Sequence, residues 1–309
     1  MPDVSAEREA ASASARPSTA ADVVVVVLTY DAPAGMLEAC VAALEASGDA
    51  ASIIVVDNGD SAVDRLRMSR CEVLTTGDNL GFAGGVNVGL RVALDRGVTA
   101  VAVLNDDVEV EPGWLGPLLR EIGDRRVGAA QPKLLFAERR EGADVVNSLG
   151  VEIGRDGAGI DIAHGERDGP AHEAARDIAL FTGGAVLFRS EFLRDVGLFD
   201  ERFFLYYEDV DLGLRGSARG WVYRCAPASR VRHRGGTSTS QVAARTRYLR
   251  ERNRLWILVR HRPAADLARG LWLSVRRVRH RPRVLHARAL LAGVAAAPRL
   301  AVARFRKRP

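Results

Sequence analysis

The chain has 309 residues, 47% of them hydrophobic, so it can bury the core of one large α/β domain and still carry an appendage. Its net charge of +5 is unevenly placed, because residues 245–309 carry about +17 and the remainder about −12. Cys40, Cys71 and Cys225 fit neither a disulfide framework nor a metal-ligand spacing, which excludes a small disulfide-stabilised fold and favours a reducing compartment.

We expect no secretory signal in the N-terminal residues. Residues 1–20 are rich in alanine, serine and charge and lack the apolar stretch of a secretory signal, so we expect a disordered leader. The apolar run at 23–28 is much too short to cross a bilayer and is typical of a buried strand. We therefore expect a cytoplasmic protein.

Strands and helices alternate over the first hundred residues. Buried strands are expected at 22–30, 52–57, 72–75 and 99–104, and helices at 34–47 and 87–96. This alternation predicts βαβ units and a mostly parallel, Rossmann-like sheet flanked by helices, with its chemistry at the carboxyl ends of the strands. Asp57 and the pair Asp106 and Asp107 each fall at such an end.

The second half of the chain is less regular. Residues 145–180 are rich in glycine and aspartate and predict either short antiparallel strands or a flexible excursion. After them we expect a strand with a glycine turn at 180–189, helices at 190–196 and 208–219, and a strand at 221–224. Beyond about residue 242 the pattern is helical.

The stretch NLGFAGGVNVG at 79–89 joins the third strand to the helix that follows. Glycines allow backbone N–H groups to approach an anion, and a helix N-terminus adds positive partial charge. The stretch matches neither the Walker loop nor the dinucleotide fingerprint. A phosphate cradle and a simple tight turn both remain possible interpretations.

Adjacent carboxylates end the fourth strand, at Asp106 and Asp107. Without a cation, each would raise the pKa of the other, whereas a hard divalent ion would relieve the repulsion and bridge phosphate oxygens. A helix cap or a solvated turn is the alternative. His233 follows a predicted strand, and it becomes a candidate metal ligand only because this carboxylate pair exists.

The segment YYEDVDLGLR at 206–215 places three carboxylates beside an aromatic run. It is either the acidic start of an amphipathic helix, stabilised by the helix dipole, or the position of a carboxylate whose pKa is tuned for catalysis. Asp211 and Arg215 have the i, i+4 spacing of a helical ion pair.

Seven short blocks occur in a fixed order along the chain. They are LTYDAP (28–33), VVDNGDS (55–61), NLGFAGGVNVG (79–89), LNDDV (104–108), FTGGAVLFR (181–189), GLFDERFFLYYEDVDLGLR (197–215) and HRGGTS (233–238). In this order they resemble the family-2 inverting glycosyltransferases of GT-A fold, and within them the bacterial rhamnosyltransferase-type branch, which builds cell-wall and surface polysaccharides. The resemblance covers about residues 22–255, and the order of the blocks makes it specific.

The resemblance implies a site for a nucleotide sugar. Thr29 and Tyr30 would line the nucleobase pocket, and Asp57 would hydrogen-bond the pyrimidine. The residues implied around the ribose and diphosphate are Asn79, Gly81 and Asn87, with Arg252, beside Asn253, at the position of a basic residue that contacts the diphosphate.

The resemblance also implies a metal site for Mg²⁺ or Mn²⁺. Asn105, Asp106 and Asp107 occupy the family's D-x-D positions, with asparagine in place of the first aspartate. Asp107 would bind the metal, Asp106 would lie beside the ribose or the metal, and His233 would complete the metal shell.

On the acceptor side, the resemblance assigns the general base to Asp209. Loss of solvation beside the aromatic run would raise its basicity. Glu208 would hydrogen-bond acceptor hydroxyl groups, and Gly183 and Gly184 would lie nearby.

The C-terminal part of the chain combines apolar residues at helical spacing with many arginines. Its apolar run at 289–297 is too short to cross a bilayer, so we expect interfacial amphipathic helices on an anionic membrane surface. Each basic residue near such a surface adds about 1 kcal/mol. A helical cap on the catalytic domain and an oligomer contact are the alternatives. Nothing indicates a nucleic-acid partner.

We therefore predict a leader at 1–20, a GT-A catalytic domain at 21–242 and basic amphipathic helices at 243–309. The expected activity is inverting, metal-dependent transfer of a sugar from a nucleoside diphosphate to a polyprenyl-linked or glycan acceptor, on the inner face of the plasma membrane. The first donor choice is dTDP-rhamnose, with UDP-hexoses or UDP-galactofuranose as alternatives.

Two other functions are weighed against this one. A nucleotidyltransferase would need a basic activating loop near the N-terminus, which LTYDAP does not supply. A catalytically silent sugar-nucleotide-binding protein would not need Asp107, Asp209 and His233 together.

Overall fold

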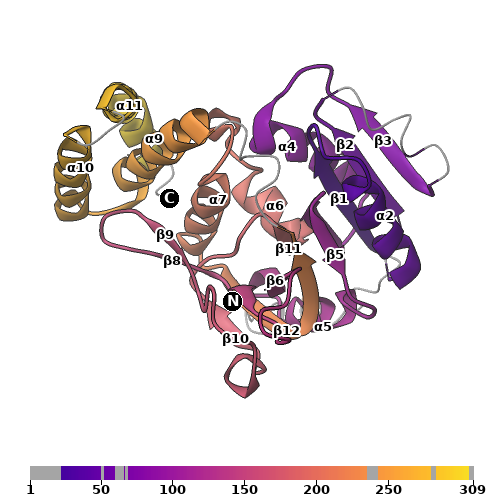
Figure 1. Ribbon diagram of the computed structural model, residues 1–309. Coiled ribbons are helices and arrows are strands. Elements are labelled where there is room, and N and C mark those ends of the chain that lie inside the picture. The colour runs from indigo at the N-terminus through magenta and orange to yellow at the C-terminus, as the bar shows by residue number, and fades with distance from the viewer. Residues whose placement is uncertain are drawn as a thin grey trace, which may run out of the picture.

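The fold is described from a computed structural model covering residues 22–49, 52–59, 66, 69–234, 243–279 and 283–305 (Figure 1). The predicted leader at 1–20 lies outside these residues. The strands are β1 Val23–Thr29, β2 Ser52–Asp57, β3 Cys71–Thr75, β4 Ala100–Asn105, β5 Val108–Val110, β6 Val127–Phe136, β7 Val146–Ser148, β8 Val151–Ile153, β9 Gly159–Asp161, β10 Arg176–Ile178, β11 Ala185–Arg189 and β12 Val222–His233. The helices are α2 Met36–Ser47, α4 Gly81–Asp95, α5 Leu115–Glu121, α6 Ser190–Val196, α7 Glu208–Ser217, α9 Ala243–His261, α10 Ala264–Val278 and α11 Arg283–Phe305, with 3₁₀ turns η2 Pro170–His172 and η3 Glu201–Phe203.

A ten-stranded mixed sheet forms the centre of the molecule, with a main strand order of β10-β12-β6-β11-β4-β1-β2-β3. The half made of β4, β1, β2 and β3 is parallel, as the alternating pattern predicted. The other half is not mostly parallel, because β11 runs antiparallel to both β4 and β6. A short antiparallel partner needs no helical crossover, so the segments after residue 136 could be added to the sheet in this way.

The side chains of strand β1 show that the sheet is buried on both faces. Successive side chains of a strand point to opposite faces. Val24, Val26 and Leu28 enter the core under α4, whereas Val23, Val25 and Val27 enter the core under α2. A continuous apolar run is therefore what this position requires.

Helix α4 begins at Gly81, six residues before the predicted start, so most of the glycine-rich stretch is helical rather than a loop. The glycines permit close packing of the helix on the sheet. A Cβ atom at Gly85 would lie 2.5 Å from Leu28 Cδ1, and one at Gly89 would lie 2.5 Å from Val26 Cγ1. The helix N-terminus is thereby held directly above the carboxyl ends of β1 and β2.

Strand β12 is much longer than the predicted 221–224, because it pairs along most of its length with β6 and with the short strand β5. In the pairing with β5, His233 lies opposite Val108. The strand therefore brings His233 next to Asp107, although 126 residues separate them in the sequence. Of the two predictions for residues 145–180, the short strands are confirmed.

Three helices follow the sheet. Ile257 of α9 belongs to the same core cluster as Val24 and Val26, so α9 is part of the main domain (Figure 1). The predicted boundary at 242 lies outside the described residues, and α9 beyond it completes the core. Helices α10 and α11 pack on α9, where Gly270 meets Leu258 and Gly293 meets Leu255. In the part of the chain that the structure describes, no helix is both long and apolar enough to span a membrane.

Candidate active site

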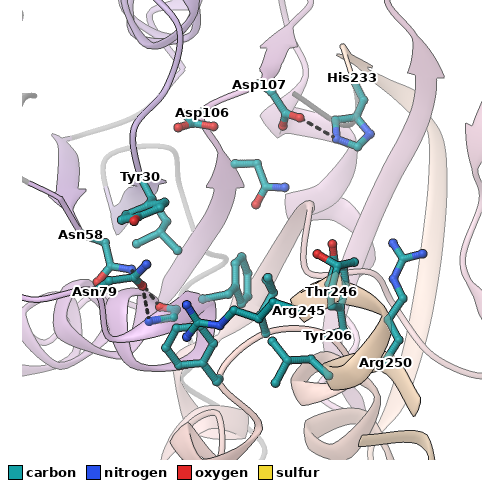
Figure 2. A pocket seen from close by; sticks show the side chains of 17 residues that line it. Tyr30, Asn58, Asn79, Asp106, Asp107, Tyr206, His233, Arg245, Thr246 and Arg250 are labelled. Atoms are coloured by element: carbon teal, nitrogen blue, oxygen red, sulfur yellow. Dashed lines mark hydrogen bonds and ion pairs between the residues drawn. The ribbon is translucent and has the colours of Figure 1, made fainter. Parts of the chain in front are cut away.

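A cavity of about 350 Å³ opens at the carboxyl ends of β1, β2 and β4, between the start of α4 and the start of α9 (Figure 2). Seven of the residues named from the sequence line it: Tyr30, Asn79, Gly81, Asn105, Asp106, Asp107 and His233. Phe204 and Tyr206, from the aromatic run, also line it, and so do residues that the sequence did not single out, namely Asn58, Phe82, Arg245, Thr246 and Arg250. Anion-binding and cation-binding groups therefore share one cavity.

One corner of the cavity is suited to a divalent cation. His233 Nε2 lies 3.2 Å from Asp107 Oδ2, and Figure 2 shows the two side chains facing each other. Asp107 Oδ1 is buried and accepts no hydrogen bond from the described residues. The other imidazole nitrogen, Nδ1, is 3.2 Å from Asn147 Oδ1, a contact that orients the ring as partners of metal-binding histidines commonly do.

The donor set fits Mg²⁺ or Mn²⁺. These ions prefer oxygen ligands and commonly take one or two from the protein and the rest from substrate phosphates and water. Among the described residues no group of three or more His, Cys, Asp or Glu side chains is arranged to hold a metal. Asp107 and His233 would therefore supply two ligands and leave several positions for a diphosphate.

Asp106 lies beside this corner but has a different partner. Thr29 Oγ1 donates a 2.7 Å hydrogen bond to Asp106 Oδ2. Burial raises the pKa of Asp106 to about 6, and the charge of Asp107 adds to this effect. Thr29 does not line the cavity, so it positions Asp106 from behind.

Asn58 joins the two loops that border the base of the cavity. Its Nδ2 donates to Asn79 Oδ1 and to the carbonyl oxygen of Gly81, at 3.2 and 3.1 Å, and its Oδ1 accepts from the backbone N–H of Leu80 at 2.9 Å. Asn79 Oδ1 also accepts from the N–H of Gly81 at 2.8 Å. The sequence signal for this role was the Asn-Gly pair at the end of β2, within the block VVDNGDS.

Besides Thr29, three predicted donor-site residues lie away from the cavity wall. Asp57 is buried, and its Oδ1 accepts from the N–H of Gly59 at 3.1 Å. Asn87 holds the chain at Phe199, because it donates to the carbonyl oxygen at 2.9 Å and accepts from the N–H at 3.1 Å. Asn87 is thus occupied in joining α4 to the segment before α7.

Arg252 also points elsewhere, because its guanidinium stacks on Trp256 at 4.3 Å and donates to the carbonyl oxygen of Phe203 at 2.8 Å. Two other arginines of α9 line the cavity instead. Arg245 lies over the ring of Phe204 at 4.5 Å, and Arg250 over the ring of Tyr206 at 4.3 Å. Figure 2 shows both in the cavity wall opposite Asp106 and Asp107.

The segment between η3 and α7 has an unusual backbone. Phe204, Tyr206 and Tyr207 have φ values of 68°, 69° and 71°, a conformation that costs about 1–3 kcal/mol per residue outside glycine. Asn253, which is fully buried, stabilises it by donating from Nδ2 to the carbonyl oxygens of Phe203, Leu205 and Tyr206, at 3.0, 2.9 and 2.7 Å. Helix α9 therefore fixes the segment that leads into the predicted base.

The predicted base, Asp209, borders the cavity without lining it. Its Oδ2 accepts a 2.9 Å hydrogen bond from the N–H of Gly183, and its Oδ1 accepts from the N–H of Val210 at 2.7 Å. A Cβ atom at Gly183 would lie 3.1 Å from Phe82, which lines the cavity, and 3.6 Å from Asp209 Cβ. The predicted acceptor-side residues Gly183, Gly184 and Glu208 thus gather around Asp209 at the edge of the cavity.

Both carboxylates at the start of α7 have raised pKa values. Burial raises the pKa of Asp209, although the N–H groups of Gly183 and Val210 oppose this rise. Burial, followed by the charge of Asp209, raises the pKa of Glu208 well above its usual range. Glu208 Oε2 is buried and has no hydrogen-bond partner within the described residues. Burial therefore favours the protonated form of both carboxyl groups.

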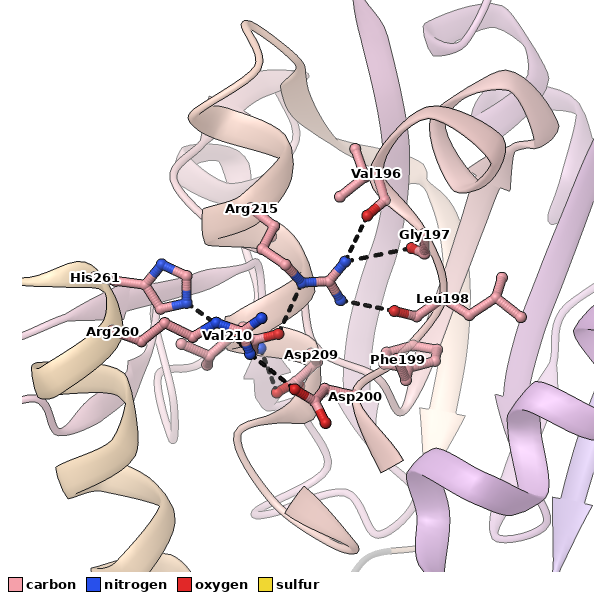
Figure 3. Close-up of polar contacts among 12 residues, drawn as sticks. Val196, Gly197, Leu198, Phe199, Asp200, Asp209, Val210, Arg215, Arg260 and His261 are labelled. Atoms are coloured by element: carbon pink, nitrogen blue, oxygen red, sulfur yellow. Dashed lines mark hydrogen bonds and ion pairs between the residues drawn. The ribbon is translucent and has the colours of Figure 1, made fainter. Parts of the chain in front are cut away.

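The third carboxylate of the cluster, Asp211, has a structural role, and its partners Arg215, Arg260 and His261 are labelled in Figure 3. Arg215 Nε donates to Asp211 Oδ2 at 2.8 Å, as the i, i+4 spacing predicted, and Arg215 also donates to the carbonyl oxygens of Val196 and Leu198 at 2.7 Å. Arg260 and His261 of α9 reach Asp211 Oδ1 at 2.9 and 2.8 Å. This cluster holds α7 against α9 and the preceding segment. An exposed acidic helix start, the alternative interpretation, is wrong for Glu208 and Asp211.

Comparison with known sequences agrees with this geometry. The family model described as "Glycosyl transferase family 2" matches residues 24–197. The chain is 30% identical over 244 residues to an N-acetylglucosaminyl-diphospho-decaprenol L-rhamnosyltransferase of Mycobacterium tuberculosis, and the match covers 71% of this chain and 78% of that protein. It is 34% identical over 142 residues to the O-antigen biosynthesis protein RfbC of Myxococcus xanthus, covering 44% of this chain and 11% of that protein.

Two solved structures show the same fold. GalNAc-T7, crystallised with UDP, GalNAc and Mn²⁺, superposes with a TM-score of 0.58 at 16% identity, covering 76% of this chain and 47% of GalNAc-T7. The mannosyltransferase PcManGT of Pyrobaculum calidifontis, in complex with GDP-Man and Mn²⁺, gives a TM-score of 0.51 at 15% identity and covers 90% and 87% of the two chains.

Proposed function

The chain belongs to glycosyl transferase family 2, has the GT-A fold and is a glycosyltransferase, and from this premise we propose the reaction that it catalyses. It transfers L-rhamnose, with inversion at the anomeric carbon, from a nucleoside diphosphate to a sugar that is carried on a polyprenyl diphosphate. The acceptor oxygen forms a bond to the anomeric carbon, and the bond from that carbon to the phosphate oxygen breaks, with its electron pair leaving on the diphosphate.

The observation that carries this proposal is the composition of the cavity. Asp107 and His233 stand on one side, and Arg245 and Arg250 on the other, within a space of about 350 Å³. Held by Asp107 and His233, Mg²⁺ or Mn²⁺ would neutralise charge on the departing diphosphate. Arg245 and Arg250 would add fixed positive charge on the opposite side. Such an arrangement suits a nucleoside diphosphate leaving group.

Nucleotide recognition falls to the residues nearest the ends of β1 and β2. Tyr30 is partly exposed at the cavity mouth, where its ring can stack on a base. Asn58 and Asn79 fix the loop backbone beside it, and Gly81 brings the start of α4 close, where N–H groups favour an anion. We place the base and ribose here and the diphosphate between α4 and Asp107.

Asp209 is the proposed general base for the acceptor hydroxyl group. The hydrogen bond from Gly183 orients its carboxylate, and the raised pKa gives it the proton affinity that a base needs. Glu208, which retains its proton to a higher pH, would donate to an acceptor oxygen. The presence of Asp209 in this position argues against a catalytically silent protein.

The choice of rhamnose and of a lipid-linked acceptor comes from the mycobacterial relative, whose name states both. We accordingly propose dTDP-L-rhamnose as the donor and a polyprenyl-linked sugar as the acceptor. The pathway would be the synthesis of a cell-wall or surface polysaccharide at the inner face of the plasma membrane.

The test is a donor screen with the purified full-length chain, Mn²⁺ and an N-acetylglucosaminyl-diphospho-polyprenol acceptor. The donors are dTDP-rhamnose, UDP-galactose, UDP-galactofuranose, UDP-glucose and GDP-mannose, and the product is identified by mass spectrometry. We expect a rhamnosylated lipid, dependent on Asp209, from dTDP-rhamnose alone. A product from another donor would refute the rhamnose assignment, and nucleotide release from none of them would refute the proposed reaction.

A further inference from the structure

Helix α10 exposes part of its apolar surface, although its leucines Leu267, Leu271 and Leu273 are half-buried. Its most buried residues are Asp266, Gly270 and Ser274, which are small or polar. Trp272 and Val275 are instead 56% and 48% exposed. A surface helix ordinarily directs its apolar stripe toward the core and its polar face toward water. The exposed apolar face of α10 therefore needs an explanation.

The inward direction of the polar face is fixed by contacts with α9. Ser274 Oγ lies 2.5 Å from Glu251 Oε1 and 2.5 Å from Arg254 Nη2, and Glu251 and Arg254 are themselves buried and paired at 2.8 Å. A Cβ atom at Gly270 would lie 2.1 Å from Leu258 Cδ1, so a larger residue would have to displace the Leu258 side chain. These contacts with α9 fix which face of α10 turns inward.

The outward face carries positive charge as well as apolar surface. Arg269, Arg276 and Arg279 are exposed, and the guanidinium of Arg276 lies over the Trp272 ring at 4.7 Å. The sequence from residue 267 to 309 contains no acidic residue. Lipid phosphates match these charges, and an aromatic ring flanked by arginines suits the boundary between headgroups and acyl chains.

We infer that the outer face of α10, formed by Ala268, Arg269, Trp272, Val275, Arg276 and Arg279, docks on an anionic lipid bilayer. Trp272 and Val275 enter the interface, and the arginines contact phosphate groups. Figure 1 shows α10 at the outer edge of the molecule, separated from α7 by α9, so nothing in the described part of the chain covers this face.

Docking would also orient the catalytic cavity. The same helix, α9, carries Arg245 and Arg250 in the cavity wall and Glu251 and Arg254 in the contact with α10. A bilayer-bound α10 therefore sets the position of the cavity relative to lipid-linked acceptors. This consequence rests on the proposed function, whereas the docking itself does not.

The docking is tested by co-sedimentation of the full-length chain with phosphatidylcholine vesicles. These are prepared with or without about 30% phosphatidylglycerol, which makes the vesicle surface strongly anionic. We expect binding to the anionic vesicles, and a loss of about 10-fold or more in W272Q/V275Q, because two inserted apolar groups are removed. R269Q/R276Q/R279Q should bind anionic vesicles weakly, and its binding should no longer fall when salt is added. V222Q, which changes a partly exposed valine on β12, is the matched control and should bind as the wild type does.

A second measurement follows Trp272 directly. Brominated lipids should quench its fluorescence, and W272F should keep vesicle binding while losing that part of the quenching. Wild-type binding by W272Q/V275Q, or equal binding to neutral and anionic vesicles, would overturn the inference. So would a lipid-independent dimer, seen by analytical ultracentrifugation, that W272Q/V275Q dissolves, since a second copy would then be the occupant.

Vesicle binding and sugar transfer are separate readouts. Trp272 and Val275 do not line the cavity. The rate at which W272Q/V275Q transfers sugar to a soluble acceptor analogue should therefore equal that of the wild type. Vesicle binding without transfer would count against the proposed reaction alone, and transfer without vesicle binding would count against the docking alone.

Discussion

At the scale of single residues, the catalytic proposal depends most on Asp209. Asp209→Asn should lose transfer by at least about 10²-fold while keeping the affinity for the nucleotide, because the variant keeps the shape of the side chain and loses its basicity. Initial rates and nucleotide titrations measure the two effects. Normal transfer by Asp209→Asn together with a loss in Glu208→Gln would reverse the roles within the pair.

The pH dependence of the wild type belongs to the same prediction. A base works when it is deprotonated, so activity should fall as the pH drops through the pKa of Asp209. Because burial raises that pKa, the acidic limb of kcat/KM should lie above the ordinary aspartate value of about 4. A limb at the ordinary value would contradict the buried environment of the base.

The metal site gives a second prediction. Chelation with EDTA should abolish transfer, and Mn²⁺ or Mg²⁺ should restore it, because the leaving diphosphate carries charge that must be neutralised. Asp107→Ala should remove the metal dependence of nucleotide binding, measured by calorimetry with and without Mn²⁺. Full activity in chelator would refute the roles given to Asp107 and His233 together.

The arginines of α9 can be distinguished from one another. Arg245→Ala and Arg250→Ala should each raise KM for the donor by about 10-fold, the effect of losing one charge-assisted contact of about 1.5 kcal/mol. Arg252→Ala should leave KM unchanged and lower the melting temperature, because Arg252 contacts Phe203 and Trp256 rather than the cavity. A donor KM effect confined to Arg252→Ala would support the original sequence-based assignment.

At the scale of secondary-structure elements, the contact between α7 and α9 depends on Asp211. Asp211→Asn should destabilise the fold by about 3 kcal/mol, since Arg215 and Arg260 would stay buried without a full negative charge. Urea unfolding measures the change, with Asp124→Asn, an exposed carboxylate of another loop, as the control. Equal losses of unfolding free energy in the two variants would show that the buried cluster stabilises the fold no more than an exposed carboxylate does.

The same carboxylate makes stability depend on pH. Burial alone would raise the pKa of Asp211, but the hydrogen bond from His261 and the charges of Arg215 and Arg260 lower it to about 2. A pKa lowered in the folded state contributes stability that is complete above the unfolded value of about 4 and is lost as the pH falls toward 2. The Asp211→Asn variant should therefore lose less stability between pH 5 and pH 3, roughly the window that spans the unfolded value, than the wild type does.

At the scale of the whole molecule, the C-terminal helices act both as a cap and as an exposed surface. Deletion of residues 264–309 should lower the stability by roughly 3–6 kcal/mol, because Leu255 and Leu258 would become exposed. Thermal unfolding detects this change. Transfer to soluble and lipid-linked acceptors should then fall together, whereas W272Q/V275Q should separate them. If the truncated chain had the same melting temperature as the wild type, α10 and α11 would not stabilise α9.

The sequence by itself determined the parallel half of the sheet, because continuous β-branched runs such as 23–28 can be buried only between two layers. It also pointed to Asp107, which lines the cavity, since a carboxylate at a strand end is recognisable locally. Asp209 was singled out from its cluster only through the family resemblance. Only the tertiary structure decided which arginine of α9 faces the cavity, that Asn253 holds the segment before α7, and that α10 directs Trp272 outward. A helical pattern defines the faces of a helix, but the helix that it packs against decides which face turns inward. Here Leu258 against Gly270 and Glu251 against Ser274 make that choice.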